Sequence, residues 1–312
     1  MTNASEQNRP HSPLLVVLLG PTGVGKTAVS LSLAKRYQAS VVSSDSRQIY
    51  REIPIGTAAP TADEMVQVPH YFIATHTLTD QYSAGQYELD VLRLLAEEIF
   101  PFQQVAILSG GSMMYVDAVC KGLDDIPSIQ LEIRAFWQQQ LDTNGLEFLQ
   151  HELQRLDPVH YEEVDLKNYK RVMHALEVCT QTGKPFSELR TGVVKPRSFQ
   201  ILKIGLNRPR AELYERINLR VDQMMEQGLL EEAQSVYPLR HLNSLNTVGY
   251  KELFEYFDGN WPLDFAIQMI KQNSRRYAKR QLTWYNRDTD IRWFHPDAID
   301  DIMTCIDQTL AE

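Results

Sequence analysis

Continuous apolar runs alternate with amphipathic segments through the first third of the chain. Residues 14–19 (LLVVLL) have no polar position, which is the pattern of a strand buried on both faces. Residues 26–37 follow a helical period. We expect the inward face of this helix to hold Ala28, Val29, Leu31, Leu33 and Ala34. Two further apolar runs, residues 40–44 and 104–109, predict more strands. Strands that alternate with helices predict an α/β fold with a doubly wound parallel sheet.

From about residue 124 to 195 the pattern changes to helix after helix. The predicted helices there are 129–141, 146–156 and 166–181, the last stopped by Gly183 and Pro185. Residues 199–206 then return to a strand pattern. We therefore expect a helical insertion domain, 124–197, within a core formed by 14–123 and 198–312. The final third predicts helices at 210–227, 229–237, 250–257 and 262–285, and an edge strand at 291–294.

The composition is that of a globular protein, with 43% hydrophobic and 23% charged residues. No apolar run approaches the roughly 20 residues that span a bilayer, so we expect no membrane association. Residues 1–13 are polar and predict a flexible leader on a cytoplasmic protein. Three cysteines without a CxxC pair fit reduced thiols, and no histidine spacing indicates zinc. We expect a monomer.

Positive charge is concentrated in one segment. The net charge of −9 weighs against a general nucleic-acid binder, because phosphate contacts need Lys and Arg. Residues 265–287, however, hold six basic residues and no acidic one, which indicates an anion bound at a chosen place. We expect Arg275, Arg276 and Arg280 to face phosphates. The aromatic residues of the segment could stack on bases or form the buried stripe of a helix, and we expect Trp284 to be core.

Residues 20–27 read GPTGVGKT, which matches GxxxxGK[ST] between a predicted strand and helix. Glycines let such a loop curl so that its N–H groups, with the helix N-terminus, converge on an anion. Lys26 supplies a full charge, and the Thr27 hydroxyl is placed to ligate Mg²⁺ on a diphosphate. The predicted phosphate-binding residues are Gly20, Pro21, Thr22, Gly23, Val24, Gly25, Lys26 and Thr27.

This P-loop predicts a polyphosphate ligand but does not specify ATP. Nucleotide hydrolysis normally needs a second strand that ends in a metal-binding aspartate. The clearest later strand ends in Ser109-Gly110-Gly111-Ser112 instead. The sequence therefore favours diphosphate binding over nucleotide hydrolysis.

Asp45 directly follows the second predicted strand. In a doubly wound sheet the carboxyl ends of neighbouring strands share the ligand crevice, which places Asp45 near the P-loop. A carboxylate there could coordinate a metal or act as general base. It could equally be the N-cap of a following helix with Ser46, Arg47 and Gln48 in its first turn.

A series of further motifs follows the P-loop. The first four are DSRQIY (45–50), IGTAAP (55–60), VPHYF (68–72) and YSAGQY (82–87). The later ones are LSGGSMMY (108–115), ALEVCTQTGKPFSEL (175–189), LYERINLRVDQMMEQGLLEE (213–232), VGYKEL (248–253) and SRRYAKRQLTWY (274–285). In this order, from about residue 14 to 295, the chain resembles the tRNA dimethylallyltransferase (tRNA isopentenyltransferase) family.

The resemblance implies a P-loop-kinase-like core with an inserted helical domain and a channel through the core. It implies that dimethylallyl diphosphate enters one end and that a tRNA anticodon loop presents a flipped-out adenine at the other. The prenyl group would join N6 of the adenine on the 3′ side of the anticodon, with release of diphosphate. Asp45 matches the family's general base, Thr22 and Lys26 its diphosphate residues, and Arg220 the arginine at the leaving group. Mg²⁺ is the implied cofactor.

The resemblance and the basic segment together give the predicted tRNA contacts. These are Asp45, Ser46, Arg47, Gln48, Ser112, Arg134, Lys170, Arg171, His174, Gly249, Tyr250, Lys251, Arg275, Arg276, Lys279, Arg280 and Gln281. The chain departs from the family pattern at Ser112, where threonine is common, and at His174, where arginine is often found. We therefore expect one phosphate contact to be weaker.

The residue types agree with this chemistry. An adenine N6 amine is a poor nucleophile, so its attack needs a base for the amine proton and a well-stabilised leaving group. Asp45 could be that base, and Lys26 and Arg220 could supply the positive field. Taken by itself, Arg220 could instead belong to a solvated helix face. Tyr71, Phe72 and Met113 could line a prenyl slot or be ordinary core.

Three other functions fit parts of the sequence. A small-molecule kinase would share the P-loop and Asp45. It would also need a second strand that ends in an aspartate, which this sequence lacks. A prenyltransferase acting on free adenine nucleotides would not need the basic segment 265–287. A non-catalytic RNA-binding module would not need an intact Lys26, Thr27 and Asp45.

Overall fold

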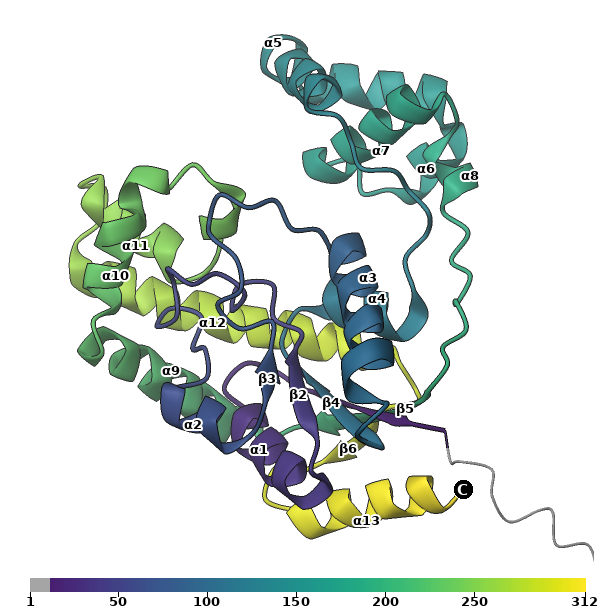
Figure 1. Ribbon diagram of the computed structural model, residues 1–312. Coiled ribbons are helices and arrows are strands. Elements are labelled where there is room, and N and C mark those ends of the chain that lie inside the picture. The colour runs from purple at the N-terminus through teal and green to yellow at the C-terminus, as the bar shows by residue number, and fades with distance from the viewer. Residues whose placement is uncertain (1–11) are drawn as a thin grey trace, which may run out of the picture. The chain divides into compact units, whose positions relative to one another are not determined.

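A six-stranded parallel sheet forms the core of the protein (Figure 1). The computed structural model describes residues 12–312, so the predicted leader, 1–13, lies almost wholly outside the described residues. The strands lie in the order β3-β2-β4-β1-β5-β6, and every neighbouring pair is parallel. They are β1 (Leu14–Leu19), β2 (Ser40–Ser43), β3 (His70–Tyr71), β4 (Val105–Ser109), β5 (Gln200–Leu206) and β6 (Arg292–Phe294). The predicted fold class is confirmed.

Helices cover both faces of the sheet, as the apolar run of β1 requires. Leu14, Val16 and Leu18 pack with one group of helices, and Leu15 and Val17 pack with another. The first group is α1 (Lys26–Tyr37), α9 (Arg210–Glu226) and α13 (Ile299–Ala311). The second group includes α3 (Ala84–Leu94), the π-helical turn Leu95–Ile99, α4 (Met113–Lys121) and α12 (Leu263–Tyr285). β1 is therefore buried on both faces.

A third apolar cluster joins the end of α9 to the helices that follow it. These are α10 (Leu229–Val236) and α11 (Tyr250–Phe257), with the short 3₁₀ turns Tyr237–Leu239 and Asn243–Leu245 between them. The cluster also contains Ile49 and Ile53 from the segment that follows β2. It thus connects the loops at the carboxyl edge of the sheet to the C-terminal helices.

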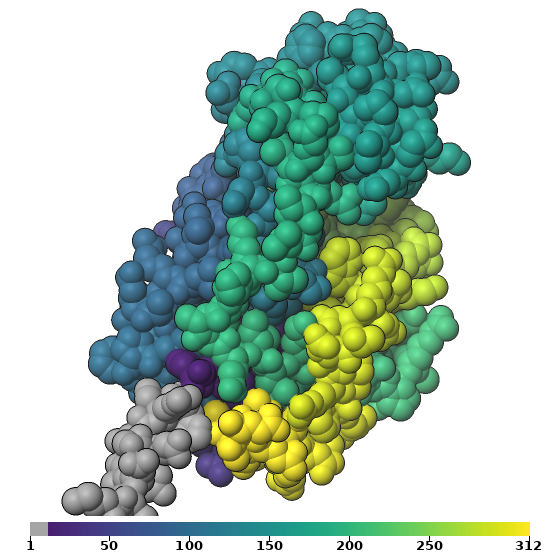
Figure 2. Space-filling view, turned by 90° about the vertical axis from the view of Figure 1, so that its right-hand side faces the viewer, coloured from purple at the N-terminus to yellow at the C-terminus, as the bar shows by residue number. Residues whose placement is uncertain are grey.

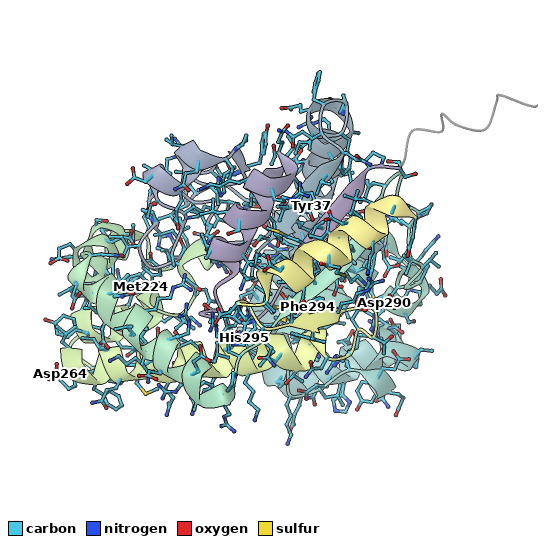
Figure 3. The ribbon with its side chains drawn as sticks, turned by 90° about the horizontal axis from the view of Figure 1, so that it is seen from below. Tyr37, Met224, Asp264, Asp290, Phe294 and His295 are labelled. Carbon is cyan, nitrogen blue, oxygen red and sulfur yellow. The ribbon has the colours of Figure 1, made fainter. Side chains whose placement is uncertain are left out.

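α13 is an element that was not predicted from the sequence, because acidic residues stand between its apolar positions. Its apolar residues Ile302, Cys305 and Ile306 are buried in the core. The Tyr37 hydroxyl of α1 donates to the Met303 carbonyl at 3.0 Å and to Asp307, where α13 passes α1 (Figure 3). In Figure 2 the C-terminal part of the chain, in yellow, lies on the face that is turned toward the viewer.

The chain divides into two compact units, residues 1–120 with 197–312 and residues 121–196. The predicted insertion, 124–197, differs from the second unit by a few residues at its start and by one at its end. That unit has its own core around Trp137, Leu149 and Leu153. Its helices are α5 (Leu131–Leu156), α6 (Pro158–Glu163), α7 (Tyr169–Thr182) and α8 (Phe186–Leu189).

Gly145 has non-helical dihedrals (φ 79°, ψ 178°) inside α5, so α5 consists of two helices joined at a kink, as predicted. Other local predictions need correction. Ala28 is exposed rather than inward, because it faces a cavity beside the P-loop. The helices α2 (Ala62–Gln67), α3 and α4 and the two-residue strand β3 were not predicted. Among residues 12–312 no helix is long and apolar enough to cross a membrane.

Candidate active site

The P-loop connects β1 to α1 at the carboxyl edge of the sheet. Gly23 and Gly25 have φ values of 81° and 113°, a region that favours glycine. A Cβ at Gly23 would also lie 2.8 Å from the Ile217 side chain of α9. The loop therefore needs glycine both for its curl and for its close approach to α9.

Some polar groups of the P-loop have hydrogen-bond partners within the protein, and other N–H groups of the loop are open, that is, without an acceptor. Lys26 Nζ donates to the carbonyls of Gly20 and Pro21 at 2.9 and 3.1 Å, and the Thr22 N–H donates to Gln281 Oε1 at 2.8 Å. Four other backbone N–H groups of the loop have no hydrogen-bond acceptor among residues 12–312. These belong to Gly23, Gly25, Lys26 and Thr27. They lie just before and at the start of α1, whose N-cap has no side-chain hydrogen bond, so they are available to an anion.

The charges around this loop are mostly positive and poorly solvated. Burial, reinforced by the nearby charge of Arg220, lowers the pKa of Lys26 to about 8, while Asp45 opposes the shift. Burial also lowers the pKa of Arg220, again with Asp45 opposing. Two cations held close together with one carboxylate form a site that would be stabilised by an added anion.

Asp45 follows β2 and begins a turn, not a helix. Its Oδ1 accepts from the Arg47 N–H at 2.9 Å. The helix-cap alternative is therefore wrong, although the side chain does stabilise the local turn. A Cβ placed at Gly111 would lie 3.4 Å from Asp45 Oδ2, so the turns after β2 and β4 are in close contact beside the carboxylate.

The turn after β4 is fastened to its neighbours by backbone and side-chain hydrogen bonds. The Ser112 N–H donates to the Ser44 carbonyl at 3.0 Å, and Ser112 Oγ accepts from the Ser46 N–H at 2.8 Å. The Gly111 carbonyl accepts from Tyr277 Oη at 3.0 Å and from Gln281 Nε2 at 2.9 Å. Since Gln281 also holds Thr22, α12 joins the P-loop to this second turn.

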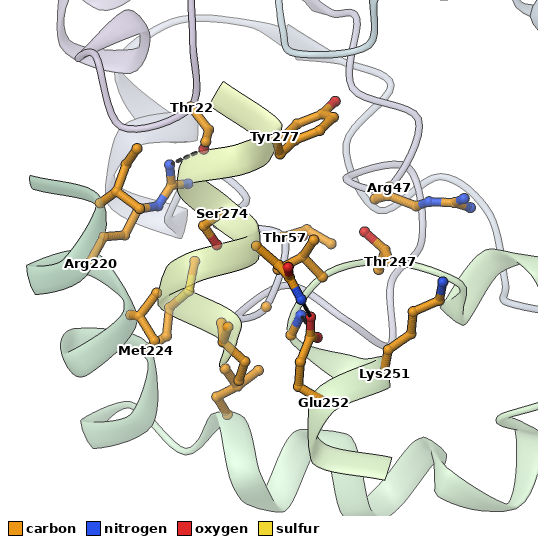
Figure 4. Close-up of a pocket in the computed structure, with 18 of the residues that line it drawn as sticks. Thr22, Arg47, Thr57, Arg220, Met224, Thr247, Lys251, Glu252, Ser274 and Tyr277 are labelled. Carbon is orange, nitrogen blue, oxygen red and sulfur yellow. Dashed lines mark hydrogen bonds between the residues drawn. The ribbon is translucent and has the colours of Figure 1, made fainter. Parts of the chain in front are cut away.

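Arg220 reaches into the site from α9. Its Nη1 donates to the Thr22 hydroxyl at 3.2 Å (Figure 4). The alternative of a solvated helix face is therefore wrong for this residue. The description of a solvated helix face applies instead to Arg216, which is exposed. Arg216 Nε nevertheless donates to the Gly23 carbonyl at 3.0 Å.

Two cavities meet at these residues. The larger, about 870 Å³, is lined by the P-loop from Thr22 to Thr27, by 109–111 and by the segment 54–62. The smaller, about 480 Å³, is lined by 45–47, 246–249, 251–252 and α12. Figure 4 shows Arg47 and Lys251 across the smaller cavity from Arg220. The residues that line both are Thr22, Asp45, Thr57, Arg220, Met224 and Tyr277.

Comparison with known proteins identifies the family. A family profile described as IPP transferase matches residues 48–288, a span that begins after the P-loop. The tRNA dimethylallyltransferase 2 of Parabacteroides distasonis is 57% identical over 296 residues, which are 95% of this chain and 99% of the relative. The tRNA dimethylallyltransferase 1 of Bacteroides fragilis is 58% identical over 296 residues, 95% of this chain and 98% of the relative. The chain belongs to the IPP transferase family.

Solved structures agree with this assignment. The tRNA isopentenylpyrophosphate transferase of Bacillus halodurans has a TM-score of 0.69 at 37% identity and covers 96% of this chain and 97% of its own. A eukaryotic dimethylallyltransferase acting on tRNA has a TM-score of 0.78 at 26% identity and covers 91% of this chain and 74% of its own. The fold of this chain therefore matches the fold of these transferases over nearly its whole length.

Most predicted tRNA contacts of the first unit of this family member surround the smaller cavity. Its lining includes Asp45, Ser46, Arg47, Ser112, Gly249, Lys251 and Arg280. Arg276 and Lys279 are exposed on α12. Arg275 instead donates to Asn218 of α9 and lies 5.9 Å from the centre of the Tyr214 ring. Its guanidinium therefore joins two helices.

Three of the predicted tRNA contacts have other partners in the structure. Gln281 and Tyr250 are both 0% exposed, so neither side chain is accessible to RNA in this conformation. Gln281 holds the P-loop, and the Tyr250 hydroxyl donates to Glu232. Gln48 Nε2 donates to the carbonyls of Thr57 and Ala58 at 3.2 and 3.0 Å. Gln48 and Gln281 line the larger cavity, so their hydrogen bonds fix its wall, whereas Tyr250 lines neither cavity.

The predicted contacts of the second unit gather on α5 and α7. Arg134, Lys170, Arg171 and His174 are all exposed. Glu177 is buried between two of them, with Arg134 Nε and His174 Nδ1 each 3.5 Å from its carboxylate. One acidic residue thus holds the arginine and the histidine on the same face.

Other lining residues were missed by the sequence analysis. The IGTAAP motif was noted, but no role was given to Thr57, which lines both cavities. Glu232 fixes this loop by accepting from the N–H groups of Ile55 and Gly56, each at 2.8 Å. The motif's small residues were the signal that could have marked a loop at a cavity wall. Tyr71, Phe72, Met113 and Trp284 pack against the second core cluster, which supports the interpretation of these side chains as core.

Proposed function

We propose that the protein transfers a dimethylallyl group from dimethylallyl diphosphate to N6 of the adenine on the 3′ side of the anticodon in tRNA. The observation that carries this proposal is the meeting of the two cavities at Asp45, Thr22 and Arg220. A donor bound on the P-loop side and an acceptor bound on the other side would place their reacting atoms at the same carboxylate. The names of the relatives supply the donor and acceptor classes.

The larger cavity has the groups that a diphosphate needs. The open N–H groups of the P-loop, Lys26 and Arg220 can all contact its oxygens. As the bond between C1 of the prenyl group and its oxygen breaks, the electron pair leaves with the diphosphate. The added negative charge is stabilised by these preorganised donors.

Asp45 is placed to act on the acceptor. The N6 lone pair attacks C1 of the prenyl group, and the amine must lose a proton as the new C–N bond forms. Asp45 accepts that proton in this proposal, since it is the carboxylate shared by both cavities. Its Oδ1 bond to the Arg47 N–H fixes the orientation of the carboxylate.

Mg²⁺ fits this donor set through the diphosphate more than through the protein. Among residues 12–312 no cluster of three or more His, Cys, Asp or Glu side chains could hold a metal. Thr27 starts α1 with an exposed side chain on the wall of the larger cavity, and its hydroxyl would be the protein ligand. Mg²⁺ commonly binds substrate phosphates with few protein ligands and keeps several waters. When bound, it would neutralise charge on the leaving group.

The smaller cavity suits a base taken out of a single-stranded loop. An enzyme that modifies a nucleobase must extract it from its stack, and anticodon loops present bases that can be splayed out. Arg47, Lys251 and Arg280 line this cavity and can contact phosphates, and Tyr277 offers an aromatic ring. The exposed basic residues of α5 and α7 would contact the tRNA elsewhere.

A small-molecule kinase is the second candidate, and one experiment separates the two. Dimethylallyl diphosphate with Mg²⁺ should raise the thermal unfolding midpoint, and Lys26→Ala should remove this protection. Labelled prenyl groups should pass to undermodified tRNA and not to AMP, while ATP should support no phosphoryl transfer. ATP-dependent phosphorylation that requires Lys26 and Asp45 and is insensitive to prenyl diphosphate would instead establish the kinase.

A further inference from the structure

A guanidinium holds the outer face of the P-loop, and the reaction described above does not use it. Arg208 lies between β5 and α9, and its Nε donates to the Val24 carbonyl at 2.9 Å. Its Nη1 contacts the Glu212 carboxylate, and its Nη2 donates to Asp297 Oδ1 at 2.9 Å. The Arg208 side chain is 10% exposed. Each of its three nitrogen atoms therefore has a fixed partner.

The contact on Val24 controls the direction of the next N–H group. In a planar trans peptide the carbonyl and the following N–H point in opposite directions, and residues 12–312 contain no cis peptide. A bond that draws the Val24 carbonyl outward therefore turns the Gly25 N–H to the other side of the loop. That N–H is one of the open donors, and Gly25 lines the larger cavity.

Gly25 cannot fix this orientation by itself. It is a glycine at φ 113°, and because glycine has no Cβ it places little steric limit on rotation of the peptide plane. A hydrogen bond from a charged donor is stronger than one between neutral groups. Arg208 is thus the group that selects one orientation of the Val24–Gly25 peptide.

Arg208 and the neighbouring Arg216 each donate to a P-loop carbonyl, but the two contacts affect the loop differently. Glu212 and Asp297 offset the charge of Arg208 and anchor it outside the loop, so it does not serve as a ligand of the anion. Arg216 holds the Gly23 carbonyl, but the N–H of that peptide belongs to Val24 and already donates to the Pro21 carbonyl at 3.3 Å. Of these two arginine contacts, that of Arg208 is the one that orients an open donor.

We propose that Arg208 is a positioning residue of the diphosphate site, acting through the Val24–Gly25 peptide. This inference rests on the proposed binding of a diphosphate at the P-loop. It predicts an effect on the diphosphate alone, because Arg208 lines neither the smaller cavity nor the exposed basic face of α12.

The test is calorimetric binding of inorganic diphosphate and of dimethylallyl diphosphate, each with Mg²⁺, to the full chain. Arg208→Gln should weaken both by about tenfold or more, the value of one lost charge-assisted hydrogen bond. Its affinity for tRNA should remain within about twofold, while kcat at saturating donor should fall, because the Gly25 N–H also stabilises the departing diphosphate. Arg93→Gln is the matched control, because it removes the same charge from an exposed pair with Asp90 on α3.

The outcomes separate this inference from the proposed function. If Lys26→Ala loses diphosphate binding and Arg208→Gln does not, the positioning role is wrong and the function stands. If Lys26→Ala also binds normally, the diphosphate site itself is wrong. A parallel fall in unfolding midpoint, tRNA affinity and diphosphate affinity in Arg208→Gln would show a merely structural residue.

Loss of folding in Arg208→Gln is not expected from unpaired carboxylates, because Glu212 and Asp297 are 39% and 71% exposed. If it occurs, Asp297→Ala decides the matter, since it keeps Arg208 and removes one of the acceptors that anchor it. We expect about threefold weaker binding of both diphosphates with unchanged tRNA affinity. Unchanged diphosphate binding in this variant would overturn the proposal.

Discussion

Asp45 is surrounded by groups that would be affected by its charge. It lies in the field of Lys26 and Arg220, opposing the lowered pKa of each, and it borders both cavities. Its position after β2 could be predicted from the sequence, because a strand end in a doubly wound sheet places a side chain in the crevice. Its turn geometry could not, since DSRQ is equally compatible with a helix start.

Replacement of Asp45 by asparagine tests its role as base. The amide keeps the shape and can still accept from the Arg47 N–H, but it cannot accept the amine proton. We expect single-turnover prenyl transfer to fall by about 10²–10⁴-fold, with tRNA affinity within a few-fold. Near-normal transfer by Asp45→Asn would reduce this residue to a stabiliser of its turn.

Lys26 gives the donor site a dependence on pH. Its pKa of about 8 in the free protein means that the ammonium is lost as the pH rises through that value. Because a bound diphosphate favours the charged form, binding above pH 8 must take up a proton. Affinity for dimethylallyl diphosphate should therefore be full below pH 8 and should fall above it. Calorimetry in buffers of different ionisation enthalpy measures the proton uptake.

Lys26→Arg is the control for this titration, since a guanidinium stays charged over the same range. The variant should lose the proton uptake near pH 8 even if its affinity is lower overall. A step of the same size and midpoint in Lys26→Arg would assign the titration to another group.

Among the secondary-structure elements, α12 combines two roles that its sequence does not separate. Its basic residues suggested an RNA-binding face, and Arg276, Lys279 and Arg280 are indeed exposed. Its buried stripe runs through Ile270, Ala278, Gln281 and Tyr285. A polar Gln281 within that stripe was the available signal that it serves a structural hydrogen bond. The surrounding charges dominate the segment and mask this signal.

The arginines of α12 should differ in their effect on tRNA binding. Arg276→Gln with Arg280→Gln should weaken binding and lower the slope of log affinity against log salt by about 0.7–0.9 for each lost phosphate contact. Arg275→Gln is the matched control from the same helix. Because its guanidinium contacts Asn218 and Tyr214, we expect little change in slope.

A titration of tRNA binding against salt makes this comparison. An equal loss of slope in Arg275→Gln would show that its contacts to α9 are exchanged for phosphate. An unchanged slope in the double variant would move the RNA surface away from α12, most directly to α5 and α7 of the second unit.

For the molecule as a whole, elements with strong periodicity were predictable and short or doubly interpretable ones were not. β1, α1 and α11 have the predicted bounds, because β1 is one continuous apolar run and the two helices follow a helical period. β3 has two residues, too few to show a pattern. α13 was hidden because its inward isoleucines alternate with acids. The P-loop could be predicted from its own motif, and the position of Asp45 from the strand that precedes it. The burial of Gln281 and Tyr250 could not, because it depends on packing between distant segments.

Nucleoside analysis of tRNA tests the central claim most directly. Undermodified tRNA is incubated with the protein, Mg²⁺ and labelled dimethylallyl diphosphate, digested, and its nucleosides are separated. The account predicts one labelled nucleoside, N6-dimethylallyl adenosine, from the position 3′ to the anticodon, and its loss in Asp45→Asn and Lys26→Ala. Label at another base or position, or equal labelling by Asp45→Asn, would contradict it.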